Sequence, residues 1–319
     1  MPPLGPLITF AFFALAGGPY VGSKACSGCH AAIYSSYVRT AMGRSLRSAS
    51  TPDQLQLVDT PVVVKRFKVF REGDHLYQSE VEKDIFDSVT GERTYKLEYV
   101  IGSGAHGFGY IVASGNRLAE APLSYYTKSK SWDLSPGYAD SDPGFQRPIV
   151  AACAACHSGR SQPVAQRMGM YGDPPFLETA IGCENCHGPG GKHATAPGEG
   201  AIVNPAKLSI ERRSRICAQC HQDSAAGPNS DLLAHDSSMR QSKCYLGSGG
   251  QLTCTTCHDP HATVSASEAA AYYRAKCVKC HATTADHGAA CTDCHMPKRP
   301  LADVPHAALT NHRIPARVQ

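Results

Sequence analysis

Residues 254–258 read Cys254-Thr-Thr-Cys257-His258, and the chain contains this Cys-x-x-Cys-His pattern seven times. Two thiols at this spacing can reach the two vinyl groups of one porphyrin, and the histidine that follows can place an imidazole beneath the iron. The unit is typical of c-type haem attachment, so the sequence predicts seven covalently bound haem c groups with their iron. The predicted attachment cysteines are Cys26, Cys29, Cys153, Cys156, Cys183, Cys186, Cys217, Cys220, Cys254, Cys257, Cys277, Cys280, Cys291 and Cys294. The predicted proximal iron ligands are His30, His157, His187, His221, His258, His281 and His295.

Two other chemistries use closely spaced cysteines, and the sequence argues against both. Paired Cys-x-x-Cys units can bind zinc, but zinc does not require a histidine at the fifth position of every unit. With 15 histidines in 319 residues, seven such placements by chance have a probability on the order of 10⁻⁹. The 15 cysteines are an odd number, in a chain too large to be a small disulfide scaffold. We predict that Cys244, the cysteine outside the motifs, is a small buried apolar residue rather than a reactive thiol.

Charge and hydropathy limit the partners of the chain. The net charge of +4 does not indicate a nucleic-acid partner, because two propionates on every haem would make the loaded protein negative. Residues 4–16 form an apolar run that is too short to span a bilayer. The run suits the core of a secretory signal peptide, or an ordered N-terminal arm. We therefore expect an exported protein with no integral membrane span after processing.

The motifs are distributed unevenly along the chain. One lies near the N-terminus and the other six lie in residues 153–295. Since Gly (29) and Pro (22) interrupt the chain often, we expect a multihaem cytochrome c fold with little regular secondary structure, short helices around the haems and a β-rich insert near the N-terminus. The expected segments are a possible signal peptide or apolar arm (1–20), a first haem segment (21–50), the β-rich insert (51–150) and a six-haem region with a C-terminal ligand tail (151–319).

Local patterns place a few elements within these segments. Alternating residues predict a hairpin of strands 62–70 and 75–81 around a Glu-Gly-Asp turn. Further strands are expected at 94–101, 109–113 and 121–127, and helices at 31–45 and 266–276. Residues 102–107 match G-x-G-x-x-G, but a strand rather than a helix is expected to follow, so we interpret this segment as a loop that presents His106.

The sixth ligand of each iron decides between two kinds of chemistry. Iron held by two histidines, or by histidine and methionine, carries electrons, whereas an open position permits binding and reaction. Eight histidines lie outside the motifs, enough to close all seven sites, and a histidine close to one motif is expected to reach a neighbouring haem. We predict His106, His193, His261, His306 and His312 as distal ligands, together with His235 and His287, while Met42 competes for one site. The remaining histidine, His75, is expected to be solvated.

Several stretches resemble the cytochrome c-552/c-554-related multihaem cytochromes. They are Tyr20–His30 with Thr40–Ser45, Ile101–Gly107, Trp132–Tyr138, Ile181–Gly190, Cys254–His261 and Cys291–Pro297. The later stretches are similar to a bacterial branch that is often fused to tetratricopeptide repeats. The resemblance implies periplasmic or extracellular electron transfer, and it implies distal roles for His193, His261, His306 and His312. The chain departs from the family pattern at Thr40-Ala-Met42, where better-known members have Ser-x-His.

We therefore expect a heptahaem electron carrier with closely packed haems, whose partners are other redox proteins or copies of itself in a polymeric filament. The alternative is a reductase or oxidase of a small nitrogen compound with one open haem. Dedicated nitrite reductases often carry a Cys-x-x-Cys-Lys haem site, which is absent from this sequence. The carrier is therefore favoured over an enzyme, and no catalytic residue is predicted. Because only nine residues separate His281 from Cys291, haems six and seven should form a close pair.

Overall fold

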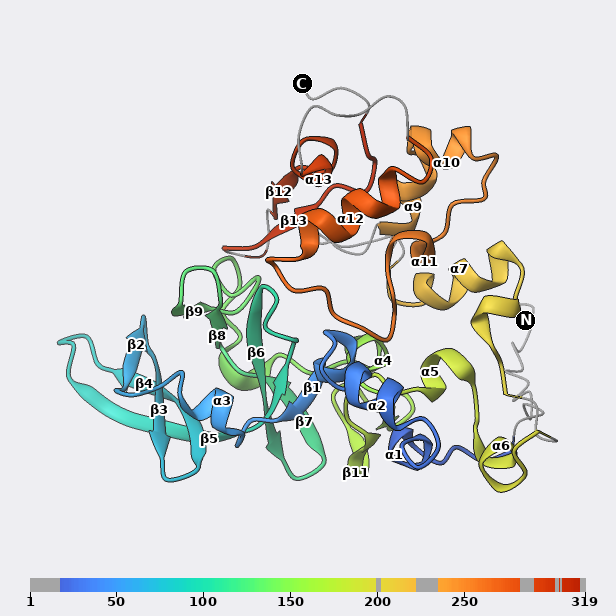
Figure 1. The fold of residues 1–319 in the computed structure, drawn as a ribbon. Coiled ribbons are helices and arrows are strands. Elements are labelled where there is room, and N and C mark those ends of the chain that lie inside the picture. The colour runs from blue at the N-terminus through green and yellow to red at the C-terminus, as the bar shows by residue number, and fades with distance from the viewer. Residues whose placement is uncertain are drawn as a thin grey trace, which may run out of the picture.

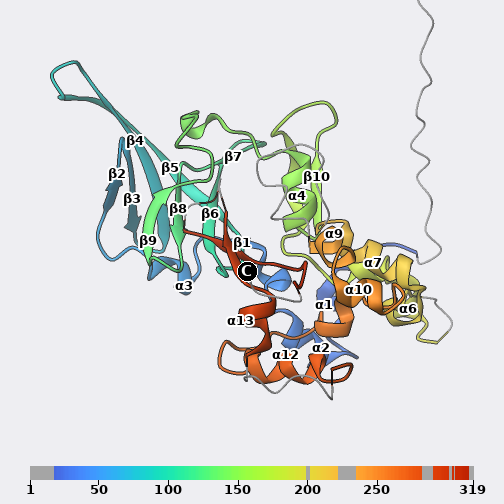
Figure 2. The ribbon, with the colours of Figure 1, turned by 90° about the horizontal axis from the view of Figure 1, so that it is seen from above.

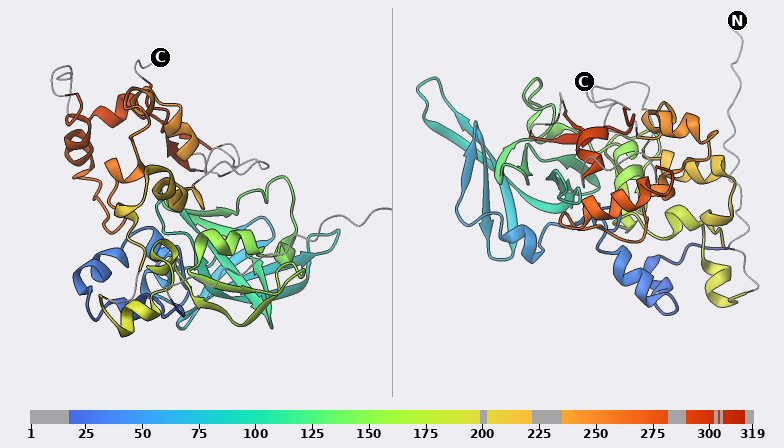
Figure 3. Two further views of the ribbon diagram at one scale, coloured as in Figure 1. Left: turned by 90° about the vertical axis from the view of Figure 1, so that its right-hand side faces the viewer. Right: turned by 45° about the horizontal axis from the view of Figure 1, so that its top comes forward.

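The structure is a computed structural model, and it describes residues 18–198, 202–221, 235–281, 290–301, 304 and 306–315. Two parts of the molecule lie side by side. Figure 1 shows an antiparallel sheet from the first half of the chain next to a group of short helices from the second half. The helices that carry motifs three to seven gather beside the sheet rather than around it (Figure 3).

The large sheet has nine strands in the order β2-β3-β4-β5-β6-β8-β9, with β1 paired to β5 and β7 paired to β6. All of these pairings are antiparallel. The strands are β1 (Leu46–Ser48), β2 (Val62–Val64), β3 (Phe67–Glu72), β4 (His75–Lys83), β5 (Val89–Ile101), β6 (Gly107–Ser114), β7 (Arg117–Glu120), β8 (Leu123–Tyr126) and β9 (Ser131–Leu134).

The hairpin of β3 and β4 shows why these residues form strands. Phe67 and Val69 on β3 and Leu76 on β4 are fully buried, whereas their neighbours along each strand are more exposed. Side chains that alternate between the two faces of a sheet allow one face to pack in the core. The tight turn between the strands includes Gly73, whose φ of 57° lies in the left-handed region.

Two apolar clusters hold the sheet together and attach it to the next segment. The larger cluster packs against α3 (Pro52–Leu55) and contains Tyr110 and Trp132, whose rings lie 5.1 Å apart. The smaller cluster joins Leu46 and Ile111 of the sheet to Ala154 of α4 (Ala151–His157) and to the strand pair β10 (Arg160–Pro163) and β11 (Tyr171–Glu178). The sheet thereby provides a rigid support for the second haem motif, which lies on α4.

The remaining helices are short, and each motif lies within one helix or at its end. They are α1 (Ser23–Cys26), α2 (Ala31–Tyr37), α5 (Glu184–His187), α6 (Gly191–Thr195), α7 (Ile210–Ala218), α9 (His235–Arg240), α10 (Lys243–Gly247), α11 (Cys254–Cys257), α12 (Ala269–Cys277) and α13 (Cys291–His295). A last strand pair, β12 (Lys298–Pro300) and β13 (Ala308–Thr310), follows α13. None of the helices in the described part of the chain has the length and apolar character needed to cross a membrane.

The expected fold class, with little regular secondary structure and a β-rich insert confined to the N-terminal part, is wrong. The protein is β-rich, with a large antiparallel sheet as its main body. Strand β1 precedes the expected insert of 51–150 and pairs Leu46 with Ile101, and the two small strand pairs fall in the expected six-haem region. The pairing of β1 with β5 joins distant segments through the tertiary fold, which local sequence patterns do not encode.

One hairpin extends away from the rest of the molecule. Strands β4 and β5 continue past the neighbouring strands into a protruding tip (Figure 2). At this tip the side chains of Ile85 and Phe86 are 92% and 80% exposed. Asp84 orders the turn, since its Oδ1 accepts hydrogen bonds from the backbone N–H groups of Phe86 (2.8 Å) and Ser88 (2.9 Å).

Candidate functional site

The haem motifs share one backbone conformation. In five of them the N–H of the histidine donates to the carbonyl of the first cysteine, which closes one helical turn. The N···O distances are 2.9 Å for His30, 3.0 Å for His187, 3.0 Å for His221, 2.9 Å for His258 and 3.1 Å for His281. The other two motifs lie inside α4 and α13. A helical turn places residues three apart on the same face, so both thiols of each motif face the same way.

Four motif histidines each lie opposite a second histidine from another segment. The ring centroids are 6.3 Å apart for His30 and His193, 6.0 Å for His187 and His261, 5.4 Å for His221 and His235, and 6.3 Å for His258 and His312. Two imidazoles that bind one iron from opposite sides have centroids about 6 Å apart, because each metal–nitrogen bond is about 2 Å long. The four separations therefore fit one iron between the two rings of each pair.

Hydrogen bonds to backbone carbonyls fix the orientation of several imidazoles. The Nδ1 atoms of His187, His295 and His312 lie 2.8, 3.0 and 3.0 Å from the carbonyl oxygens of Val203, Pro315 and Thr310. A carbonyl oxygen only accepts hydrogen bonds, so Nδ1 carries the proton in each ring. This tautomer leaves the lone pair of Nε2 available for a metal.

His235 has the clearest need for a further ligand. Its Nε2 is buried and has no hydrogen-bond partner in the part of the chain that the structure describes, an arrangement that disfavours folding unless another group satisfies the nitrogen. Burial, and next the neighbouring His312, lower the pKa of His235 to about 4. The imidazole is therefore neutral at physiological pH, which is the form that binds metal.

The distribution of apolar core residues also fits bound haem. After Ile181, the buried hydrophobic residues of the described chain are Met239 and Ala307, although five of the seven motifs lie in this part. Helices of this length are not stable in water without packing partners. Large apolar porphyrins attached to the motifs would supply the missing core, so the residues present fit the group.

A buried carboxylate connects the first motif to the third. Glu184, within the third motif, is 4% exposed, and it accepts hydrogen bonds from the backbone N–H groups of Val21 (3.1 Å), Gly22 (2.7 Å) and Gly190 (2.7 Å). The backbone N–H of Cys183 also donates to Ser23 Oγ at 2.7 Å. The sequence analysis missed this role of Glu184. The position of Glu184 between the two cysteines of a motif was the one feature of the sequence that could have indicated this role.

The second motif is held by a polar contact with the N-terminal segment. Ser45 Oγ donates to the carbonyl of His157 at 2.7 Å and accepts from the N–H of Ile181 at 3.1 Å. Tyr37 contributes nearby, because its hydroxyl donates to the Ile181 carbonyl at 2.8 Å. Tyr37 and Ser45, which follow the first motif, thus link the second motif to Ile181, two residues before the third motif.

The other predicted distal ligands do not lie opposite a motif histidine in the described chain. His306 is placed against the sheet, with Nε2 3.1 Å from Asp133 Oδ2. His106 lies before β6, where burial, and next Lys298, lower its pKa. Met42 begins a 3-10 turn that ends at Arg44, and His287 lies outside the described residues. The ligand roles of these four residues stay predictions.

Two residues that were expected to have no role at the haems have defined surroundings. The ring of His75 is not simply solvated, because its Nδ1 lies 2.8 Å from Ser50 Oγ. Cys244 on α10 is half-buried, and this burial raises the pKa of its thiol. A protonated thiol is a weak nucleophile, so low reactivity is expected at Cys244.

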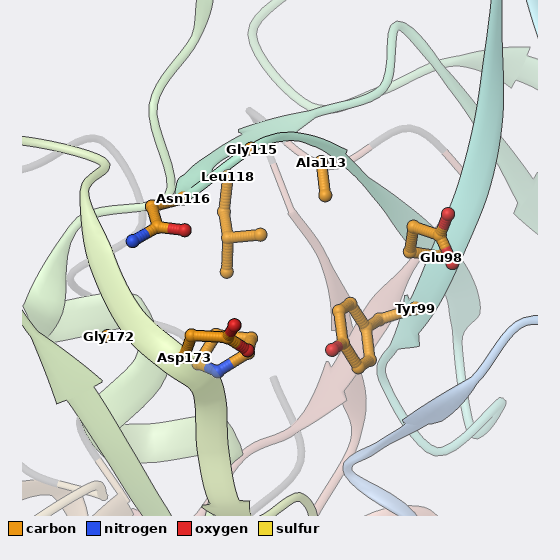
Figure 4. A pocket seen from close by; sticks show the side chains of 9 residues that line it. Glu98, Tyr99, Ala113, Gly115, Asn116, Leu118, Gly172 and Asp173 are labelled. Atoms are coloured by element: carbon orange, nitrogen blue, oxygen red, sulfur yellow. The ribbon is translucent and has the colours of Figure 1, made fainter.

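A hollow in the sheet region is separate from the motifs. It lies between β5, the β6–β7 turn and β11, and Glu98, Tyr99, Leu118 and Asp173 are among the residues that line it (Figure 4). Its lining contains no cysteine or histidine, so it contributes nothing to the haem sites.

Comparisons with known proteins point to one group. Residues 248–286, which include the fifth and sixth motifs, match a family model described as doubled CXXCH motif. Multiheme cytochrome MtrA of Shewanella baltica is 23% identical over 173 residues, which is 41% of this chain and 52% of MtrA. C-type polyheme cytochrome OmcB of Geobacter sulfurreducens is 24% identical over 184 residues, which is 46% of this chain and 25% of OmcB. The chain thus spans about half the length of the first relative and a quarter of the second.

Among solved structures, an undecaheme cytochrome from the S-layer of Carboxydothermus ferrireducens aligns with a TM-score of 0.44 and 17% identity, over 90% of this chain and 45% of that one. The resemblance to multihaem cytochromes is confirmed by the family model and the two named relatives. The link to the c-552/c-554 members and to the repeat-fused branch stays a prediction. The chain is thus similar to multihaem c-type cytochromes, and its Cys-x-x-Cys-His motifs support covalent binding of haem c.

Proposed function

We propose that the chain is a heptahaem c-type cytochrome that carries electrons along closely packed haems between redox proteins outside the cytoplasm. The observation that carries the proposal is the set of four histidine pairs with ring separations of 5.4–6.3 Å. Haem iron supplies a one-electron ferric/ferrous couple when it is bound. Iron closed by two imidazoles transfers electrons without binding substrate.

The chain's own residues have three tasks in this function. The fourteen motif cysteines fix the haems covalently, and the seven motif histidines provide the proximal ligands. His193, His261, His235 and His312 are the proposed distal ligands opposite His30, His187, His221 and His258. For the motifs of His157, His281 and His295, the proposed distal ligands come from His106, His306, His287 and Met42.

Intact mass and spectroscopy of the purified, oxidised protein test this function. We expect the mass of the mature polypeptide plus seven haems, and a low-spin electron paramagnetic resonance (EPR) spectrum from all irons. Fewer than six haems, or zinc, would contradict the cofactor assignment. A stoichiometric high-spin haem that binds carbon monoxide when reduced would favour the alternative, a reductase or oxidase of a small nitrogen compound.

The proposed location is periplasmic or extracellular, and the reading of the apolar run at residues 4–16 as a signal peptide, rather than as an apolar arm, supports it. The proposed partners are other redox proteins or further copies of this chain. Electron micrographs of the purified protein distinguish discrete particles from a filament.

A further inference from the structure

A tyrosine side chain lies directly behind the proposed proximal ligand of the fifth motif. The hydroxyl oxygen of Tyr273 is 3.3 Å from Nδ1 of His258. The two rings meet edge to face, with centroids 5.5 Å apart and an angle of 66° between their planes. Nδ1 is the ring nitrogen that stays free for a hydrogen bond when Nε2 binds a metal. The tyrosine is therefore placed to act on the ligand rather than on the iron.

Helix α12 brings Tyr273 to this place. The helix contacts α11, whose C-terminal end leads into His258. Cys277, the first attachment cysteine of the sixth motif, follows Tyr273 by four residues on α12 and so lies on the same face of the helix. The helix that would hold haem six thus also supplies the side chain behind the ligand of haem five.

The direction of the hydrogen bond follows from the ligand role of His258. A tyrosine hydroxyl can donate or accept, but an imidazole that binds iron through Nε2 carries its proton on Nδ1, so here the hydroxyl oxygen accepts. His187 and His295 face backbone carbonyls instead, with Nδ1 2.8 Å from Val203 and 3.0 Å from Pro315. The partner of His258 differs from these in that a single substitution can remove it.

The ring opposite His258 is also held in place. Nδ1 of His312 lies 3.0 Å from the carbonyl oxygen of Thr310, and the planes of the His258 and His312 rings are inclined at 34° to each other. With both rings fixed by hydrogen bonds, the angle between the two proposed ligands of haem five is fixed as well. This angle influences the g values of a low-spin EPR signal, so it can be followed experimentally.

We propose that Tyr273 is a positioning residue that orients His258 and lowers the reduction potential of haem five. A hydrogen bond accepted from Nδ1 makes the imidazole a stronger donor to iron, which favours the ferric state. Reduction of this haem adds one electron from a neighbouring haem or a donor protein, and the proton stays on Nδ1. The inference rests on the proposed electron-carrier function and adds a residue that sets the potential of one haem.

Tyr273→Phe tests this role, because it keeps the aromatic ring and removes the hydroxyl. In a spectroelectrochemical titration of the haem-loaded protein, we expect one of the seven one-electron steps to move to higher potential. The low-spin EPR signal of the same haem should change its g values, since one ring is no longer held. Tyr272→Phe is the matched control, because Tyr272 precedes Tyr273 on the same helix and its ring packs against Lys276 Nζ at 4.7 Å. The control should leave the titration and the spectrum as in wild type.

His312→Ala identifies the haem that responds. It removes the proposed distal ligand of haem five, so the low-spin signal lost in this variant should be the one altered by Tyr273→Phe. An unchanged titration in Tyr273→Phe, a change at another haem, or the same shift in the Tyr272→Phe control would overturn the role of Tyr273. If the wild-type protein shows seven low-spin haems in that case, the electron-carrier function survives.

The structure of the haem-loaded wild-type protein decides the role of Tyr273 if Tyr273→Phe does not retain seven haems by intact mass. A Tyr273 hydroxyl within hydrogen-bond distance of His258 Nδ1 supports the proposal. Another acceptor in that position would overturn it.

Discussion

At the scale of single residues, the distal histidines are the most informative. His261 lies three positions after His258, yet its ring faces His187 of another motif at 6.0 Å. His261→Ala should therefore open the haem attached at Cys183 and Cys186, and leave the haem beside His258 closed. We expect one high-spin haem of the seven, still covalently bound, that binds one carbon monoxide per chain after reduction.

The control for this prediction is His75→Ala, because His75 on β4 contacts Ser50 and has no proposed ligand role. It should leave the spectrum low-spin. A structure of the carbon monoxide complex locates the opened site, and an opening at the haem of Cys254 and Cys257 would contradict the pairing.

The same residues show what the sequence can and cannot predict about the site. The motif residues were predictable because covalent attachment needs cysteines and histidine at a fixed local spacing. The partner of each distal histidine was not, because His193 meets His30 and His312 meets His258 only through the tertiary fold. The short spacing along the chain excludes the nearest haem as the partner of a distal histidine, but it does not identify which of the other haems that histidine binds.

At the scale of elements, Glu184 fastens the N-terminal segment to α5. Glu184→Gln replaces the buried carboxylate with an amide that cannot accept all of the backbone N–H groups facing it. We expect a loss of about 2 kcal/mol in the free energy of unfolding, in the range for hydrogen bonds to charged groups. Denaturant titration measures this change, and proteolysis near residues 18–24 should become faster.

Glu211→Gln is the matched control, because Glu211 is an exposed residue of α7 that pairs with Arg215. Its effect should stay within about 0.5 kcal/mol. An equal loss of unfolding free energy in the two variants would show that the Glu184 contacts stabilise the fold no more than an exposed ion pair does.

Asp53, at the start of α3, gives the sheet region a dependence on pH. Burial alone would raise the pKa of Asp53, but hydrogen bonds from Thr51, Arg47 and Gln54 lower it to about 2. Because the pKa in the unfolded chain is about 3.9, the ionised carboxylate stabilises the fold above about pH 4 and loses this effect as the pH falls towards 2.

Asp53→Asn should therefore destabilise the protein by about 1 kcal/mol at pH 6, a value reduced by solvent screening of this partly exposed pair. The difference from wild type should shrink to nearly zero at pH 2. Thermal unfolding followed by circular dichroism between pH 2 and 6 checks this expectation, and a constant difference would contradict it.

Secondary structure was predictable where local patterns decide it. The alternating residues of β3 and β4 and the turn at Gly73 indicated a hairpin, and the structure contains one. The single strand expected over 62–70 is instead two antiparallel strands, β2 and β3, because the chain turns back at Lys65. The helix expected over 31–45 ends at Tyr37 instead. There Thr40 Oγ1 donates to the Tyr37 carbonyl at 2.7 Å. Gly43 also packs against Tyr37, so tightly that a Cβ atom at position 43 would lie 2.4 Å from the Tyr37 carbonyl oxygen. The helix ends early because of these packing contacts, and the spacing of apolar residues along the sequence does not predict them.

At the scale of the whole molecule, the two parts depend on haem to different degrees. The sheet region has its own apolar core, whereas Met239 and Ala307 are the buried hydrophobic residues of the described chain beyond Ile181. Protein produced without haem attachment should therefore keep the sheet with α4, and lose the structure of the helices that carry motifs three to seven. Limited proteolysis with mass spectrometry should give a protected fragment that contains residues 46–178, while residues 202–315 are cut rapidly. Equal protection of both parts would contradict this division.

The contact between the first motif and Glu184 also has a consequence for the order of events during biogenesis. Val21 and Glu184 are 163 positions apart in the chain, and at 5–20 residues per second the ribosome needs roughly ten to thirty seconds to make that stretch. During this interval the first haem site exists without the carboxylate that fastens it and without His193. The haem site that is made first can therefore be completed only after the chain has been made as far as His193.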